Sequence, residues 1–467
     1  MTRDSIAARG MVLIMSKQFL AGVVTVVGGF LLSKVLGPQD FGIYVICQSL
    51  TAVLTIIGRL GVNGWLLVQK SEPTEADYRI ALAVMFAAST LVSCLSFPVL
   101  PLLEQFSRIP GLFWPTVFSA LMLPVYVLVI PATVRLERQL RYRPVVVIEL
   151  VCQIVALAVG VSLAFHGWGV WGPLFGWLVR EIINCVMSWA VVGLLPHVSR
   201  DTIRVREILQ FGTKYSLAIG IGQSRNLVFL TLVGRMLGSE AVGFLGLAIK
   251  AAGLASPVRA AAARLMLPTL APIVHTPEAL RRGLKVLVET EVLLSVPVVV
   301  SAIIVYSLGV EFLLGPAWQP TVALLPWVVA ASLLMSPHAP ALSVLNMSSH
   351  FRESYSASAL SLMALAVTVI LLEGAYGVEG CAAALLIGWP ASWLQEWFAR
   401  EHMGTSNPTI GMLWAIGGAG ICLAMRLGPW MLILPVIVVA VTYSDILCRS
   451  HALMTAIRFN GRANARF

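Results

Sequence analysis

The stretch KVLGPQDFGIY, residues 34–44, is repeated in outline by RMLGSEAVGFL, residues 235–245. In both, a cationic residue stands two places before Leu-Gly at the end of an apolar run, and a second glycine five places on opens the next run. We expect Gly37 to adopt the left-handed conformation that ends a helix, and Pro38 prevents that helix from continuing. Each stretch therefore predicts a tight connection between two apolar helices.

The composition predicts a membrane protein with many spans. The chain has 467 residues, of which 58% are hydrophobic and only 12% charged, and its mean hydropathy is +0.88. A soluble domain cannot hide that much apolar surface, and a span needs about 20 apolar residues. Fourteen runs fit, near 11–33, 42–69, 80–103, 112–134, 145–165, 170–195, 210–234, 241–266, 286–309, 320–345, 356–376, 379–399, 410–427 and 429–448. Because the last two are short, twelve spans plus a hairpin are equally consistent.

A second repeat indicates how these spans are organised. GVWG at 169–172 is matched by GVEG at 377–380, an offset of 208 residues that is close to the 201 residues between the first pair. Each pair falls at the same helix junction of its half, and an even number of spans separates the copies. Parallel repeats of this kind are typical of transporters with a site between two lobes. We predict an N-terminal lobe at 1–200, a C-terminal lobe at 201–403, and a helix pair with a basic tail at 404–467.

The charged residues predict the orientation of the chain. With the N-terminus in the cytoplasm, 24 of the 32 Lys and Arg residues fall on the inner side. Four fall outside, Lys34, Arg108, Arg235 and Arg426, and four lie within spans. This asymmetry predicts that both termini are cytoplasmic. It also explains the net charge of +10 by contact with anionic lipid rather than nucleic acid.

The two repeated stretches, extended to 31–50 and 207–255, resemble the starts of the two halves of bacterial polysaccharide flippases. These belong to the multidrug/oligosaccharidyl-lipid/polysaccharide exporter superfamily. The resemblance implies an all-α polytopic membrane protein with 12–14 transmembrane helices in two parallel six-helix lobes that form a V, plus a C-terminal helix pair. It also implies a bacterial inner-membrane location and a polyprenyl-diphosphate-linked oligosaccharide as cargo. Further expected partners are membrane lipids, a polysaccharide polymerase and export machinery.

Cations within spans are the main candidates for binding that cargo, because a charge in the bilayer needs a cavity or a partner. Arg225 and Lys250 lie near the middle of their helices, and Arg59 lies about a turn toward the cytoplasm. Arginine can meet diphosphate oxygens with two parallel hydrogen bonds, so we predict a cationic cavity that binds diphosphate. Arg59 could equally snorkel inward, and Arg180 and its neighbour Glu181 are each expected to pair with another helix.

Other polar residues within the spans are weaker candidates. Four amides could add donors for phosphate or sugar hydroxyls: Gln48, Asn63, Gln223 and Asn226. A gradient-driven antiporter needs a carboxylate that can exchange a proton or bind sodium within the membrane. The candidates for that role are Glu149, Glu181, Glu289 and Glu291.

Together these features predict a flippase for lipid-linked oligosaccharide, serving exopolysaccharide, capsule or O-antigen biosynthesis by alternating access. One alternative is an ion-coupled exporter of small molecules or drugs on the same fold. Another is a membrane polysaccharide polymerase or ligase, but the loops are too short for the long outer loop such an enzyme needs. We expect no catalytic residues, no cofactor, and no metal site, because neither Cys nor His residues show ligand spacing. The glycan, the energy source and the oligomeric state are left open.

Overall fold

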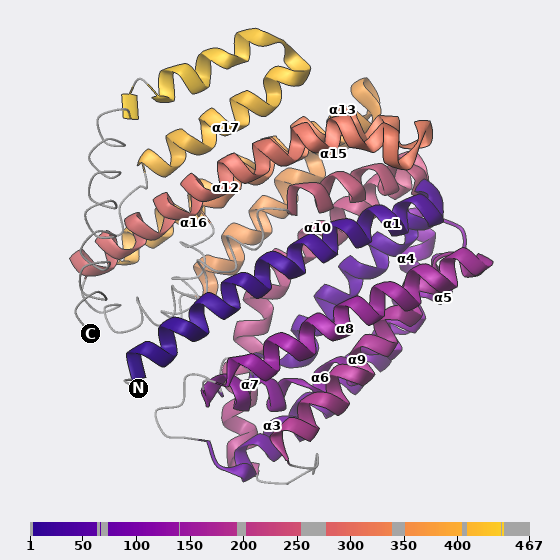
Figure 1. Cartoon of the computed structure of the whole chain (residues 1–467), viewed down its shortest axis with the longest axis vertical. Helices are drawn as coiled ribbons and strands as arrows, with labels where there is room; N and C mark the ends of the chain where they lie inside the picture. Colours follow the sequence, from indigo (N-terminus) through magenta and orange to yellow (C-terminus); the bar gives the residue numbers. More distant parts are fainter. Residues whose placement is uncertain are drawn as a thin grey trace.

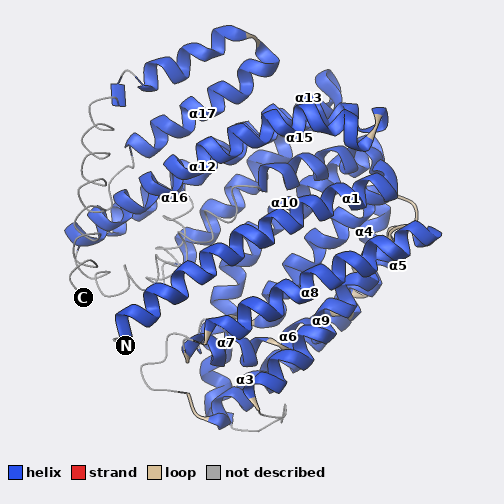
Figure 2. Cartoon of the chain, viewed as in Figure 1, coloured by secondary structure: helices blue, strands red, loops and turns tan. Residues whose placement is uncertain are grey.

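The structure is a computed structural model that describes residues 3–62, 66, 73–139, 141–193, 202–253, 277–338, 351–403, 409–439 and 441–442. Within these ranges the chain is helical throughout, with short turns and no strand (Figure 2). The N-terminal half contains α1 (Arg3–Arg59), α3 (Glu75–Ser96), α4 (Leu100–Ser107), α5 (Phe113–Leu121), α6 (Leu123–Leu128), α7 (Ile130–Arg138), α8 (Tyr142–Leu163) and α9 (Trp171–Val192). The C-terminal half contains α10 (Thr202–Ala252), α12 (Pro277–Leu314), α13 (Gln319–Met335), α15 (Phe351–Ile387), α16 (Trp389–Met403) and α17 (Thr409–Leu427).

Both repeated sequences adopt matching backbone conformations. α1 bends at Gly37, with φ 72° and ψ 172°, and α10 bends at Gly238, with φ 82° and ψ 176°. The second pair also agrees, since Gly169 has φ 50° and ψ −132° and Gly377 has φ 55° and ψ −134°. Residues with a side chain rarely reach these regions. Gly37 therefore has the positive φ expected of it, but its ψ lies in the extended region open to glycine rather than in the left-handed helical one. The two halves share their bends as well as their motifs.

The helices of the two halves form two groups with α1 and α10 between them (Figure 1). In the N-terminal half, α3, α5, α6, α8 and α9 pack against α1, α7 packs against α8 and α9, and α4 packs against α5 and α10. In the C-terminal half, α12, α13, α15 and α17 pack together. α1 makes its most extensive contact with α10. The domain boundaries predicted at 200 and 403 fall at or beside the ranges 194–201 and 404–408, which lie outside the described residues. They stay predictions.

Nine helical stretches of the described residues are long and apolar enough to cross a membrane. Three of the nine, Val27–Arg59, Ile219–Ala252 and Arg352–Leu394, each run through a glycine bend and take in two of the predicted apolar runs. α12 covers the predicted run at 286–309, and a shorter apolar helix, Pro429–Val439, covers part of the last one. The helices thus follow the order of apolar runs in the sequence.

Glycines hold the two halves together next to the bends at Gly37 and Gly238, which we call the hairpin end. A Cβ atom on Gly42 would overlap the carbonyl oxygen of Ser239, and one on Gly243 would overlap the carbonyl oxygen of Pro38. Gly42 and Gly243 are themselves 201 positions apart, as are Pro38 and Ser239, so the interface is nearly reciprocal, as in a two-fold dimer. Close backbone approach through small residues is the usual way in which membrane helices associate.

α8 and α9 pack in a similar way, and this contact fixes the orientation of α9. A Cβ atom on Gly172 would lie 2.7 Å from the carbonyl oxygen of Gly160, and one on Gly176 would lie 2.5 Å from that of Ala156. Gly172 and Gly176 are one turn apart and therefore face α8 together. The neighbouring face of α9 is left to line a cavity.

Candidate substrate-binding cavities

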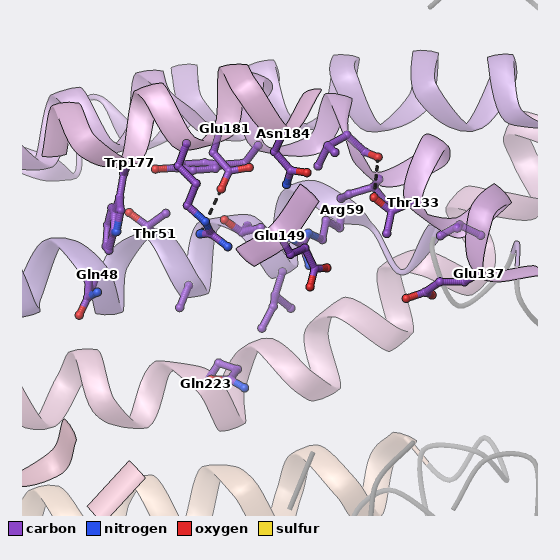
Figure 3. Close-up of a pocket in the computed structure, with 18 residues that line it drawn as sticks. Gln48, Thr51, Arg59, Thr133, Glu137, Glu149, Trp177, Glu181, Asn184 and Gln223 are labelled. Carbon is purple, nitrogen blue, oxygen red and sulfur yellow. Dashed lines mark hydrogen bonds and ion pairs between the residues drawn. The ribbon is translucent and has the colours of Figure 1, made fainter. Parts of the chain in front are cut away.

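A cavity of about 720 Å³, which we call the larger cavity, lies within the N-terminal half and is bounded on one side by α10 (Figure 3). α1 contributes Gln48, Thr51, Thr55 and Arg59, all on one face of the helix because they are spaced three or four residues apart. α9 contributes Trp177, Arg180, Glu181 and Asn184, each of which has another of the four three or four positions away. Other polar lining residues are Tyr126, Thr133, Glu137, Glu149 and Gln223.

Charges of both signs meet in this larger cavity. Arg180 Nη1 lies 3.2 Å from Glu181 Oε1, and Glu181 also lies within electrostatic range of Arg59 on α1. Asn184 hydrogen-bonds to the same carboxylate. The expectation that Arg180 and Glu181 each pair with another helix is wrong for Arg180, since the two neighbours pair with each other. Glu181 faces another helix as well, through Arg59.

Two donors in this cluster are left without a partner. The Nε atoms of Arg59 and Arg180 are buried and have no hydrogen-bond partner among the described residues. An unpaired buried donor costs about 1–3 kcal/mol, and more when it is charged. Both N–H groups lie behind the wall of the cavity without accessible surface, so a ligand oxygen reaches them only if the side chains move.

The smaller cavity, of about 390 Å³, lies in the C-terminal half, and Arg225 and Asn226 of α10 line it with residues of α13 and α15. Arg225 Nη1 donates to Met335 Sδ at 2.7 Å, a weak acceptor. Its Nε and Nη2 atoms are buried without a hydrogen-bond partner in the described part of the chain. Gly388 leaves room for the guanidinium, because a Cβ there would lie 2.9 Å from Nη2. Among the described residues, none that lines this cavity is acidic.

Lys250 lies at the contact between the two halves and is not among the described residues that line either cavity. Its Nζ donates to Gln48 Oε1 at 2.5 Å and stands 5.8 Å and 5.1 Å from the ring centroids of Phe41 and Tyr44. Gln48 Nε2 in turn donates to Tyr44 Oη at 3.0 Å. Lys250 therefore joins α10 to α1, and only its partner Gln48 reaches the larger cavity.

The remaining predicted residues are divided between several places. Gln223 and Glu149 line the larger cavity, and Asn226 lines the smaller one. Glu289 and Glu291 are buried on α12. Ser336 Oγ donates to Glu291 Oε1 at 2.8 Å, and Lys285 Nζ lies 4.0 Å from Glu289 Oε1. Asn63 lies outside the described residues.

The sequence predicts one cationic cavity, whereas the structure distributes the predicted residues between two cavities of different charge. Arg59, Gln48 and Gln223 reach the larger cavity, where three carboxylates outnumber two guanidinium groups in the described lining, while Arg225 and Asn226 reach the smaller one. Sequence reasoning also missed Trp177 and Asn184. The signal that could have found them is the spacing of polar residues by three and four along the apolar helix α9.

Helices long and apolar enough to span a membrane, with one polar and one mostly apolar cavity bordering α10, indicate a membrane transporter. The chain belongs to the polysaccharide biosynthesis protein family, whose sequence model matches residues 31–323. It is 23% identical over 274 residues to the succinoglycan biosynthesis transport protein ExoT of Rhizobium meliloti (strain 1021). That match covers 56% of this chain and 53% of ExoT, about half the length of the relative.

Solved structures share the fold. The lipid II flippase MurJ in its inward closed conformation aligns with a TM-score of 0.63 and 15% identity, over 94% of this chain and all of MurJ. The multidrug transporter DinF-BH aligns with a TM-score of 0.57 and 15% identity, over 86% of this chain and 96% of that one. The predicted family and fold class are thereby confirmed. ExoT and MurJ are, by name, a transport protein and a flippase.

Proposed function

We propose that the protein is a flippase that moves a polyprenyl-diphosphate-linked oligosaccharide across the bacterial inner membrane for polysaccharide biosynthesis. The observation that carries the proposal is Arg225, a buried guanidinium with two unpaired nitrogen atoms beside a cavity, in a member of a polysaccharide biosynthesis family. A chain of this family with MurJ's fold needs a site for the charged linkage of its cargo, and Arg225 fits that need.

The chemistry of the linkage suits this site. A buried charge without a counterion is strongly destabilising, by about 3–5 kcal/mol when a buried pair loses one partner. A diphosphate supplies oxygens that a guanidinium meets with parallel, charge-assisted hydrogen bonds. Since no carboxylate is among the described residues that line the smaller cavity, none of them competes with the diphosphate for Arg225.

Alternating access would use the contact between α1 and α10. With both termini in the cytoplasm, the hairpin end faces the periplasm, and the glycine contact of Gly42 with Ser239 closes that side. Separation of α1 from α10 would open it, with the predicted lobes 1–200 and 201–403 moving as units and the helix pair at 404–467 following the C-terminal lobe. A polysaccharide polymerase would take the cargo on the outer side.

One observation favours a second candidate, an ion-coupled exporter of small molecules. Glu181, Glu289 and Glu291 are buried carboxylates in a chain with the fold of DinF-BH. Intramembrane acids of this kind mark ion pathways. The lipid cargo could equally be driven by the same ions, so substrate assays have to separate the two candidates.

The test uses purified protein in liposomes and a fluorescent polyprenyl-diphosphate oligosaccharide, prepared from cells that make the polymer. A membrane-impermeant reductant quenches only lipid in the outer leaflet. The proposal predicts that the protein raises the quenched fraction from about half to nearly all, and that empty liposomes stay near half. Export of a cationic fluorescent dye without movement of the lipid would overturn the proposal in favour of the exporter.

A further inference from the structure

A third internal repeat lies in the connections that follow α4 and α12. GLFWPTV at 111–117 is matched by GPAWQPTV at 315–322, with the two tryptophans 204 positions apart. Gly111 has φ 79° and Gly315 has φ 90°, so each connection turns through a glycine with positive φ before the next helix begins. We call residues 106–112 the first connection and residues 315–318 the second connection, since they occupy corresponding places in the two halves.

The second connection packs against α1 of the opposite half. Trp318, at the end of the short helix η4 (Pro316–Trp318), is only 1% exposed. Its ring meets the ring of Phe41 on α1 edge to face, with centroids 5.5 Å apart, and meets Phe244 on α10 in the same way at 5.9 Å. Edge-to-face contact is a favoured arrangement of aromatic rings, and a buried tryptophan removes a large apolar area from water. Trp318 therefore joins the two halves, one turn after the bend at Gly37.

The first connection packs against α10 of the opposite half. Arg235 Nη1 donates to the carbonyl oxygen of Phe106 at 3.1 Å, and the guanidinium carbon lies 5.0 Å from the centroid of the Phe106 ring. Ile109 is 1% exposed and fills the space over Gly234, where a Cβ would lie 2.6 Å from Ile109 Cδ1. These contacts fall on the last turn of α10 before the bend at Gly238. Each connection thus reaches the helix that forms the hairpin end in the other half.

The two repeated tryptophans differ in their surroundings. Trp114 is the counterpart of Trp318 in the motif, yet it is 65% exposed and packs against its neighbour Phe113, with ring centroids 5.1 Å apart. It takes part in neither of the contacts between the halves described above. The chain therefore contains a matched pair of tryptophans, of which one joins the halves and the other lies at the surface.

We infer that the two connections form a gate at the hairpin end, which they close from both sides and which opens only when each releases the opposite half. η4 packs on α12 and α13, and short turns join α4 to α3 and α5, so each connection moves with its own half. Separation of α1 from α10 would therefore withdraw Phe41 from Trp318 and Gly234 from Ile109. The inference rests on the proposed function for the use of this opening in transport.

The first experiment measures the opening of the hairpin end by double electron–electron resonance. Spin labels at Gln39 and Glu240 report the distance between the halves in full-length protein whose native cysteines have been replaced. Trp318→Ala is expected to raise the ratio of open to closed molecules at least about tenfold, equivalent to about 1.4 kcal/mol. Trp114→Ala is the matched control and should leave the distances unchanged. Trp318→Phe keeps an aromatic ring and should open less than Trp318→Ala, and each variant has to elute as a single peak in gel filtration.

The second experiment locks the first connection. Ile109→Cys and Gly234→Cys are combined in the same cysteine-free protein and oxidised to a disulfide with copper phenanthroline. The disulfide is expected to slow the movement of polyprenyl-diphosphate oligosaccharide in liposomes at least about tenfold, and dithiothreitol should restore it. Ile109→Cys alone, treated in the same way, should move the lipid as fast after oxidation as before.

Three results would overturn the gate. They are unchanged distances in Trp318→Ala, equal opening in Trp114→Ala, and undiminished movement of the lipid by the disulfide-linked protein. The proposed function fails separately, because a cysteine-free parent that moves no lipid refutes the flippase while the distance measurements still decide whether the connections close the hairpin end.

Discussion

A single methyl group at the hairpin end should force the two halves of the protein apart. In Gly42→Ala the new Cβ would overlap the Ser239 carbonyl oxygen and lie 3.0 Å from the Gly243 nitrogen. Gly243→Ala would place its Cβ on the Pro38 carbonyl oxygen. These are backbone atoms in a buried interface and cannot rotate away. Only separation of α1 from α10 relieves the overlap.

The magnitude follows from the cost of overpacking. An extra methyl group in a well-packed site costs about 1–3 kcal/mol. If this free-energy cost falls only on the conformation in which the hairpin end is closed, the ratio of closed to open molecules changes by about 5- to 150-fold. The two substitutions act on one interface, so the double variant should cost less than the sum of the single ones, because separation relieves both overlaps at once.

The assay is a distance measurement across the hairpin end by double electron–electron resonance. Spin labels replace Gln39 and Glu240, which are exposed and 201 positions apart, in protein whose native cysteines have been replaced. We expect one short distance for the parent protein and a longer, broader distribution for Gly42→Ala and Gly243→Ala. Gly374→Ala is the matched control, since a Cβ there meets open space. Unchanged distances in both hairpin variants would refute the reasoning.

The remaining predictions concern charges. Gln48→Leu should lower the free energy of unfolding by roughly 1–3 kcal/mol more than Lys250→Met does, because Gln48→Leu leaves the Lys250 ammonium without its acceptor. The Tm measured in thermal unfolding should fall accordingly, and the double variant should recover the loss. Glu181→Gln should raise the affinity of the larger cavity for diphosphate several-fold, because it removes a carboxylate that repels the anion. The measurement is equilibrium dialysis in protein that already carries a neutral residue at position 225. Unchanged binding would contradict this repulsion. Glu379→Gln breaks an exposed ion pair with Arg426, so it should change stability by less than about 1 kcal/mol and leave flipping unaltered.

The sequence was sufficient for the fold because the signals that define it are local. A glycine that must adopt positive φ, as at Gly37 and Gly238, marks a bend whatever surrounds it. Apolar length marks a span in the same way. Repetition of the bends at fixed offsets then relates the two halves without knowledge of their packing.

The site was predicted only in part, because a position along a helix does not fix which way a side chain faces. Arg225 and Gln223 are two residues apart and reach different cavities. Lys250 was predicted to bind ligand, yet it contacts Gln48 across the two halves, a partner 202 positions away. Such contacts depend on how α1 and α10 are rotated against each other, which packing of the whole chain determines.

The central claim is that Arg225 receives the charged linkage of a lipid-borne glycan. The most direct test is the rate constant for transbilayer movement of polyprenyl-diphosphate oligosaccharide in liposomes with Arg225→Gln, compared with wild type and with Arg426→Gln, which changes an exposed arginine. We predict a rate at least about tenfold lower for Arg225→Gln alone, equivalent to about 1.4 kcal/mol. Equal rates for all three proteins would contradict the account.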